Sequence, residues 1–397
     1  MPQTHFDNEL SLLPPVNELS PSWRKYIKSI KSQFPFDDKL KQNLSEIGLS
    51  TLAPYLAWVP FELLSAVKEV AKGGYARVYR ADVAVPKLLC GLMNRHKIIA
   101  LKEIQLTMLR EVIIQHSSAV LSKFRLLTRF VKLLMYRSPG ARFIRLIGLS
   151  RHAETGNYFL VTEYAECGSL EHNQNKRSMF FDSWGDVIEN ARQISACLAT
   201  LHDINIIHQD LHPKNIVYKY EAGRNARIID FGLSQVIADS HNDSDGHYGR
   251  LPYIPPECFG DDKSPYTAAS DVYCLGTILW QLGSQVSPRD TAVKLQVDGM
   301  REEHVPGTPK RYKQIINDCW NVDPQKRPTA KEVHRRLSKL HNYILIQAFF
   351  LVGGIRYMIP PFGKRLVYLK RMKAEADKRE ETSDSFIFSE QTTVSNM

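Results

Sequence analysis

The sequence predicts an α+β protein, with strands gathered in the first half of the chain and helices in the second. Apolar stretches of strand length, interrupted by polar turns, lie between residues 63 and 165. Beyond them, apolar residues recur at helical spacing over residues 186–201 and again over 270–280. This segregation of strands from helices is typical of the α+β class.

Length and charge limit the classes of protein to consider. The 397 residues suffice for one two-lobed domain with extensions. With 52 Lys and Arg against 42 Asp and Glu, the net charge is +10, which would suit nucleic acid or an anionic membrane. No RNP-like, zinc-finger or arginine-rich repeat accompanies this charge, so we expect no nucleic-acid binding.

Cysteine usage and the first residues predict an intracellular, cytoplasmic protein. The six cysteines are scattered, without a CxxC pair or a metal-like spacing, which fits a reducing compartment. Residues 1–22 are polar and contain prolines, unlike a secretory signal peptide.

Residues 1–62 are expected to form an N-terminal leader that is partly helical. Helical stretches are predicted near residues 23–32 and 40–49, and Trp58-Val59-Pro60 is expected to pack on the domain that follows. The sequence does not indicate what the leader does.

Residues 63–81 predict two strands joined by a tight glycine turn. Apolar and polar residues alternate on both sides of Gly73 and Gly74. Without side chains at these two positions, backbone N–H groups can closely approach the phosphates of a ligand.

The next predicted strand, residues 98–102, is apolar and ends in Lys102. A lysine in such a strand is costly unless it is paired or bound to an anion. Further strands are predicted over residues 143–149 and 157–165.

Two short apolar runs, each followed by an acid, form the most informative part of the chain. The first leads to His208, Asp210 and Asn215, and the second leads to Asp230. Asp210 is suited to orient a hydroxyl group, while Asn215 and Asp230 are suited to hold magnesium against the phosphates of a nucleotide.

These segments resemble the protein kinases, and the ordered set is more specific than any one of them. The matching features are the glycine turn with Val78, the lysine-ending strand, HxDxxxxN, IDFG, the APE-like Pro255-Pro256-Glu257, Asp271, and CWNxDPxxRP at residues 319–328. The last of these is similar to the tyrosine-kinase-like group of Ser/Thr kinases. A small-molecule kinase of the aminoglycoside or choline type shares the HxDLHPxN loop but lacks the later signatures.

The resemblance implies a bilobal protein kinase fold over residues 63–341. A small β-rich N-lobe, about 63–165, would lie over a larger helical C-lobe, about 166–341, with ATP and Mg²⁺ in the cleft. Residues 342–397 would form an extension with an apolar helix and a basic tail. The substrate would be a protein, with Ser/Thr favoured as acceptor and Tyr as the alternative.

The resemblance also assigns roles to individual residues. Catalysis would use Asp210, Lys214 and Lys102, and the metal ligands would be Asn215 and Asp230. Glu257 and Arg327 would pair, and Asp271 would hold the catalytic loop. The residues expected to bind the nucleotide are Gly73, Gly74, Val78, Ala100, Lys102, Thr162, Glu163, Ala165 and Val217.

The chain departs from the kinase pattern in its regulatory and acceptor positions. Gln209 replaces the arginine that normally binds a phosphorylated residue of the activation loop, so we expect the protein to be active without such phosphorylation. His212 stands where Ser/Thr enzymes usually carry lysine, and Arg250 stands at the usual threonine. The acid that pairs with Lys102 is either Glu111 or absent.

Further departures leave other functions open. Ala71 and Ala76 replace two glycines of the usual loop, which motivates a non-catalytic scaffold as the alternative. A lipid- or nucleic-acid-binding role rests only on the net charge. The apolar residues 343–355, followed by basic residues, are expected to form a packed helix rather than a membrane-associated segment over residues 343–373. The oligomeric state is not predicted.

Overall fold

The structure is a computed structural model that divides into two compact units. Unit 1 comprises residues 1–166 and 227–235, and unit 2 comprises residues 167–226 and 236–397. The structure describes residues 15–47, 50–72, 77–84, 97–104, 143–175, 183–203, 205–219, 226–230, 235–236, 251–258, 265–288 and 301–350.

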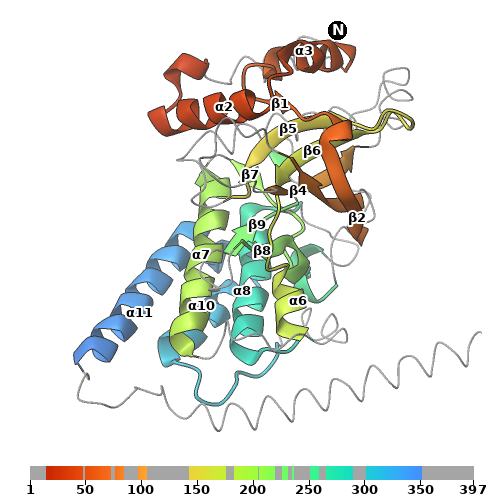
Figure 1. Ribbon diagram of the computed structural model, residues 1–397. Helices are drawn as coiled ribbons and strands as arrows, with labels where there is room; N and C mark the ends of the chain where they lie inside the picture. The colour runs from red at the N-terminus through yellow and green to blue at the C-terminus, as the bar shows by residue number, and fades with distance from the viewer. Residues whose placement is uncertain are drawn as a thin grey trace, which may run out of the picture. The chain divides into compact units, whose positions relative to one another are not determined.

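Unit 1 contains a six-stranded sheet with the order β1-β5-β6-β4-β3-β2 (Figure 1). Strand β1 runs parallel to β5, and the other neighbours are antiparallel. The strands are β1 (Ala57–Trp58), β2 (Leu64–Lys72), β3 (Arg77–Val83), β4 (Lys97–Ile104), β5 (Leu146–Arg151) and β6 (Tyr158–Glu163).

Helices α2 (Pro21–Gln33) and α3 (Asp37–Glu46) of the leader belong to this unit. The spacing of Trp23, Ile27, Ile30 and Phe34 places an apolar stripe along α2. Ser20 begins this helix by accepting a hydrogen bond from the N–H of Trp23.

The core of unit 1 lies where this stripe meets the sheet. Ile30 and Phe34 pack in one cluster with Ile99 and Leu101 of β4 and with Val161 of β6, and all five are at most 1% exposed. The leader therefore buries one face of the sheet. Val59 belongs to the same cluster and Trp58 pairs with Leu149 of β5, so the expected packing of Trp58-Val59-Pro60 on the residues that follow is confirmed.

A close approach of two backbones lets β1 join the sheet. Ala57 lies opposite Gly148 of β5, where a Cβ atom would stand 1.8 Å from the carbonyl oxygen of Ala57. The N–H of Val59 then donates to Leu149 O at 2.9 Å. Glycine at position 148 is thus required for the leader strand to pair.

Unit 2 is mainly helical. In it, α7 packs along both α11 and α8, and α10 packs along α8 (Figure 1). Helix α8 begins at a capping box made by Thr267 and Ser270 and ends at Gln285 with a left-handed backbone. The helices are α6 (Leu170–Asn175), α7 (Trp184–Asp203), α8 (Ala268–Ser284), α10 (Lys310–Cys319) and α11 (Ala330–Phe350).

Short strands and 3₁₀ turns lie between these helices along the chain. In β8, the N–H of Tyr218 donates to Gly168 O, and Tyr218 O accepts from the N–H of Cys167. These elements are β7 (Ile206–Ile207), η6 (Pro213–Asn215), β8 (Ile216–Tyr218), β9 (Ala226–Ile228), β10 (Gln235–Val236), η8 (Leu251–Tyr253), η9 (Pro256–Cys258) and η10 (Pro324–Lys326).

The α+β class is confirmed, and so are the helices and strands predicted within the described residues. Glu111, the acid that would pair with Lys102, lies outside them, as does the chain beyond residue 350. Helix α11 continues into the apolar segment as far as Phe350, but the expected packing is wrong for Tyr343, Leu345 and Ile346, which are about half exposed. The residues of α11 that face the core end at Leu340. No described helix is both long and apolar enough to cross a membrane.

Candidate active site

Strand β4 presents Lys102 on the face of the sheet opposite to the leader. Lys102 pairs in register with Val78, and Ala100 pairs with Thr162. Because residues directly opposite each other point to the same side, these four side chains share one face. Ala100 and Lys102 are half-buried, whereas their neighbour Leu101 is fully buried on the other face.

Lys102 forms an ion pair with Asp230 within unit 1. The Nζ atom of Lys102 donates to Oδ1 of Asp230, and the side chains are 29% and 42% exposed. Asp230 has a φ angle of +62°, in the left-handed region that a non-glycine residue seldom adopts. An unusual backbone conformation thus accompanies the pairing of the two residues that were predicted to contact phosphate and metal.

A buried aspartate in helix α8 of unit 2 fixes the catalytic loop. Asp271 is fully buried, and it accepts hydrogen bonds from the N–H groups of His208 at 2.7 Å and Gln209 at 3.0 Å. The hydroxyl group of Tyr266 donates to it at 3.1 Å, and His202 Nε2 lies 3.0 Å away. These contacts stabilise a buried charge and hold the loop, including the left-handed Gln209 at φ +67°.

Asp210 is held by contacts to both of its carboxylate oxygens. The Nδ2 group of Asn215 lies 3.1 Å from Oδ2 of Asp210 and 2.8 Å from its backbone O. On the other side, His212 Nε2 lies 3.3 Å from Oδ1. With 21% of its side chain exposed, Asp210 stays accessible to a substrate.

Lys214 and Val217 follow on the same loop. Lys214 is half exposed, and its Nζ lies 3.7 Å from Oε2 of Glu171 in helix α6. Val217 is buried in β8, where it bridges Ser169. The loop thus carries an aspartate, a lysine and an asparagine within six residues.

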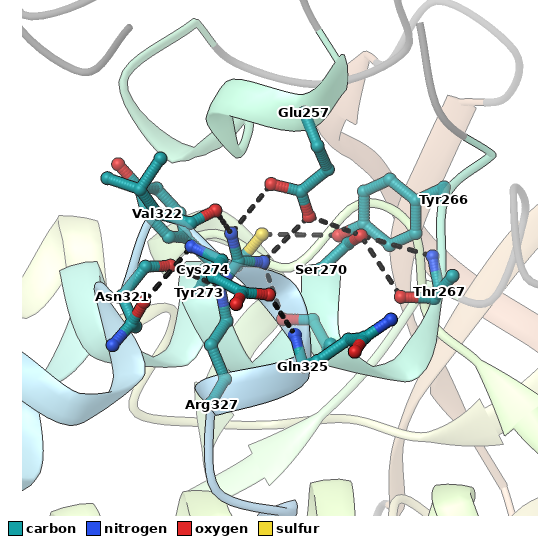
Figure 2. A network of polar contacts seen from close by, with 12 residues as sticks. Glu257, Tyr266, Thr267, Ser270, Tyr273, Cys274, Asn321, Val322, Gln325 and Arg327 are labelled. Carbon is teal, nitrogen blue, oxygen red and sulfur yellow. Dashed lines mark hydrogen bonds and ion pairs between the residues drawn. The ribbon is translucent and has the colours of Figure 1, made fainter. Parts of the chain in front are cut away.

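The predicted pair of Glu257 and Arg327 is present and buried (Figure 2). Both guanidinium Nη atoms lie 2.6 Å from the carboxylate of Glu257. Arg327 also donates to Asn321 O and Ala269 O, and its guanidinium lies 4.9 Å from the centroid of the Tyr273 ring. This fork geometry joins the APE-like segment to the CWNxDPxxRP segment.

The predicted adenine contacts lie at the end of β6. The N–H of Glu163 donates to Arg145 O at 2.9 Å, so Glu163 would meet a base through its carbonyl oxygen. Thr162 and Ala165 are half-buried. Gly73 and Gly74 lie outside the described part of the chain, as does the predicted activation segment from Leu233 to Tyr253 apart from residues 235–236 and 251–253.

Three contacts near the site were not predicted. Glu171 meets Lys214 although 43 residues separate them, and no local pattern signals this. Tyr253 donates to Gln281 Oε1, which ties the APE-like segment to α8. His212 caps η6 by accepting a hydrogen bond from the N–H of Lys214, and Pro213 was an available signal for this cap, because proline often follows a capping residue.

A family model for protein tyrosine and serine/threonine kinases matches residues 64–337, which is more than half of the chain. The chain belongs to this family. The resemblance found in the sequence is therefore confirmed, and proteins of this family generally use ATP and Mg²⁺.

Relatives of this kinase-family chain come from several animals. It is 30% identical over 252 residues to a putative mitogen-activated protein kinase kinase kinase 7-like of Drosophila melanogaster, covering 56% of the chain and 60% of that protein. It is 30% identical over 217 residues to dual specificity testis-specific protein kinase 2 of Rattus norvegicus, covering 52% of the chain and 37% of the relative. It is also 30% identical over 203 residues to mitogen-activated protein kinase kinase kinase zak-1 of Caenorhabditis elegans, covering 47% of the chain and 27% of that protein. The chain thus spans less than two thirds of each relative.

Proposed function

We propose that this chain is a protein kinase that transfers the γ-phosphate of ATP to a hydroxyl group of a protein, with Ser/Thr as the acceptor. The observation that carries this proposal is the catalytic loop, in which Asp210 is held by Asn215 and the loop backbone is held by buried Asp271. A preorganised carboxylate of this kind suits phosphoryl transfer, in which positioning and electrostatics supply most of the catalysis.

In this proposal, the nucleotide binds to one face of the sheet in unit 1. Lys102 holds the α- and β-phosphates, and Val78, Ala100 and Thr162 lie on the same face to contact the base. The carbonyl of Glu163 and the backbone of Ala165 bind the adenine edge. Gly73 and Gly74 approach the phosphates, and Val217 is a further residue that we propose to contact the base.

The donor atoms of Asn215 and Asp230 suit a magnesium ion. Both offer oxygen, which is the ligand that this hard cation prefers, and Asn215 directs its amide nitrogen at Asp210. Magnesium, when bound, neutralises charge on the phosphates. Asp230 pairs with Lys102, so we infer that the binding of MgATP exchanges this pair for contacts to metal and phosphate.

The chemical step is an in-line displacement at the γ-phosphorus. The oxygen of the acceptor hydroxyl forms a bond to phosphorus while the bond to the bridging oxygen of ADP breaks, and the hydroxyl proton passes to Asp210. Lys214 neutralises charge on the transferring group. Its contact with Glu171 is at 3.7 Å and half exposed, so Lys214 can leave it at little cost.

We place the kinase domain at residues 63–341 and the protein in the cytoplasm, with a Ser/Thr-bearing protein as substrate. The names of the relatives support Ser/Thr, since two are mitogen-activated protein kinase kinase kinases. One relative is a dual-specificity kinase, so phospho-amino-acid analysis of the product must include tyrosine.

Incubation with γ-labelled ATP, Mg²⁺ and a mixed protein substrate tests the proposal. Lys102→Met should abolish most transfer, because it removes the phosphate contact. Lys97→Met is the matched control: Lys97 lies in the same strand but on the other face, so transfer should persist. Equal labelling by wild type and Lys102→Met would favour the scaffold function instead.

A further inference from the structure

We propose that Tyr26 of the leader is a positioning residue for adenine, because it fixes the end of strand β6 at Glu163. The inference rests on the proposed function, in which the carbonyl oxygen of Glu163 accepts a hydrogen bond from the amino group of the base. Tyr26 acts through Arg145 and Leu146, which lie next to the end of β6. The leader thereby contributes to the preference of the site for adenine over other bases.

The side chain and the carbonyl oxygen of Glu163 lie toward opposite faces of the sheet. Glu163 pairs in register with Ile99, which is fully buried in the cluster that contains Ile30 and Phe34 of the leader. Because residues directly opposite each other point to the same side, the side chain of Glu163 lies on the face that the leader covers. Its carbonyl oxygen accepts from the hydroxyl group of Thr162, on the other face, at 3.2 Å. A carbonyl oxygen has two lone pairs, so one remains for a base.

The carboxylate of Glu163 forms an ion pair with Arg145. The Nη1 atom of Arg145 lies 3.7 Å from Oε1 of Glu163, and the two side chains are 33% and 13% exposed. A carboxylate with so little exposure to water is costly unless it is paired. The N–H of Glu163 also donates to Arg145 O at 2.9 Å. The same arginine therefore holds Glu163 through its side chain and through its backbone.

Tyr26 of helix α2 contacts both this arginine and the residue that follows it. The guanidinium of Arg145 lies 5.3 Å from the centroid of the Tyr26 ring, within the range of a cation–π contact. The hydroxyl group of Tyr26 donates to Leu146 O at 2.8 Å. Burial raises the pKa of Tyr26, Glu163 acts in the same direction, and Arg145 acts in the opposite one. The side chains of Tyr26, Arg145 and Glu163 thus form one interacting cluster.

The hydrogen bond from Tyr26 meets strand β5 at a β-bulge. Leu146 pairs with Thr162, but one extra residue, Ile147, separates it from the next pair of the two strands. A bulge disrupts the local ladder and bends the strand, so the position of the chain there depends on additional contacts. The donor from the leader supplies such a contact, beside the point where β6 ends at Glu163.

Two variants weaken this cluster at different points. Tyr26→Phe keeps the aromatic ring and removes the donor to Leu146, and Arg145→Met removes the ion pair with Glu163. Tyr158→Phe is the matched control. The hydroxyl group of Tyr158 also joins β6 to the leader, at 2.9 Å, but it does so at the opposite end of the strand.

The preference for ADP over IDP measures the proposed effect. Displacement of an ATP analogue labelled on the ribose gives the dissociation constants of MgADP and MgIDP. Hypoxanthine carries an oxygen where adenine carries its amino group, so the carbonyl of Glu163 should favour ADP. We expect Tyr26→Phe and Arg145→Met to lower this preference at least about threefold and Tyr158→Phe to keep it. A wild-type preference in Tyr26→Phe, or an equal fall in Tyr158→Phe, would overturn the proposal.

Kinetics and a double variant test the same inference independently. In Tyr26→Phe, KM for ATP should rise while kcat stays within about twofold of wild type, since the reacting atoms are not touched. The double variant with Arg145→Met should lose little more preference than the larger single change, because both act on one strand end. A fall in kcat with an unchanged KM, or fully additive losses of preference, would contradict the inference.

The binding experiment also separates a failure of this inference from a failure of the proposed function. Both dissociation constants come from one sample, so a fraction of unfolded protein leaves their ratio unchanged. If neither nucleotide displaces the analogue from the wild type, the proposed nucleotide site itself fails. If the wild type prefers ADP and Tyr26→Phe prefers it equally, the proposed function stands and only the role of Tyr26 fails.

Discussion

The hydroxyl group of Tyr158 donates a hydrogen bond of 2.9 Å to Oδ1 of Asn43, joining strand β6 to a helix 115 residues earlier in the chain. Glu46, on the same helix, lies 3.2 Å from the same hydroxyl group and 3.0 Å from Nη1 of Arg151. Tyr26 adds a second link by donating to Leu146 O at 2.8 Å. The leader is therefore attached to the sheet by polar contacts as well as by its apolar stripe.

Removing one core side chain of the leader should destabilise the sheet. Phe34 is fully buried against β-sheet residues, so Phe34→Ala should lower the free energy of unfolding of unit 1 by about 3–5 kcal/mol. Chemical denaturation followed by tryptophan fluorescence measures this, because Trp58 lies in β1. Lys28→Ala, on the exposed side of the same helix, is the control and should change stability by less than about 0.5 kcal/mol. Equal effects of the two variants would show that the leader is not part of the fold of this unit.

The contact at Tyr158 predicts a loss of stability in alkaline solution. Burial raises the pKa of Tyr158 from 10.0 to about 12; Glu46 acts in the same direction and Arg151 in the opposite one. The unfolded chain thus ionises at this tyrosine before the folded chain does. The contribution of Tyr158 to the free energy of unfolding is fully present below about pH 10, and it is lost as the pH rises toward 12. In Tyr158→Phe, the free energy of unfolding should fall less steeply over this range in urea titrations. Parallel curves for the two proteins would contradict the assignment.

The buried pair of Glu257 and Arg327 should be strongly coupled. Arg327 is fully buried, so Arg327→Met leaves an uncompensated carboxylate and should cost about 3–5 kcal/mol of unfolding free energy. The double variant with Glu257→Gln should cost less than the sum of the two single changes, as measured in a thermodynamic cycle. The exposed pair of Arg335 and Glu332 is the control, and Arg335→Met should cost much less unfolding free energy than Arg327→Met, because solvent screens an exposed pair. Additive costs at the buried pair would refute the coupling.

Gln209 predicts independence from phosphorylation of the activation segment. The side chain has no charge with which to bind a phosphate, unlike the arginine that usually stands there. Changing Ser234, Ser240, Ser244 and Tyr248 together to Ala or Phe should keep the transfer rate within about threefold of wild type. A loss of most activity would contradict this prediction, because it would mean that another basic group binds a phosphate on the activation segment.

Local patterns in the sequence predicted most of the helices and strands in the described residues. The apolar run that ends in Lys102 indicated a strand, and the register with Val78 and Leu160 shows why that strand presents the lysine on one face. The long helices followed from apolar residues at helical spacing. Packing was less predictable: the spacing of Tyr343 and Leu345 suggested burial, but both are exposed because nothing in a local pattern says where the partner helix ends.

Contacts between distant residues could be predicted only where the family pattern supplied them. Glu257 and Arg327 were expected to pair because both belong to kinase signatures. The ion pair of Lys102 with Asp230, the contact of Lys214 with Glu171, and the link from Tyr158 to Asn43 depend on how the chain folds back. The leader is the clearest case, since its amphipathic helices were predicted but the surface that they cover was not.

The rate of phosphate transfer by Asp210→Asn at saturating MgATP tests the account most directly. The substitution keeps the size of the side chain but removes the base for the acceptor proton, so we expect the rate to fall at least about 100-fold. ATP binding, followed with a fluorescent analogue in the same samples, should stay near the wild-type level, because Asp210 is not a proposed nucleotide contact. A rate for Asp210→Asn equal to that of wild type would contradict the assignment of the catalytic loop.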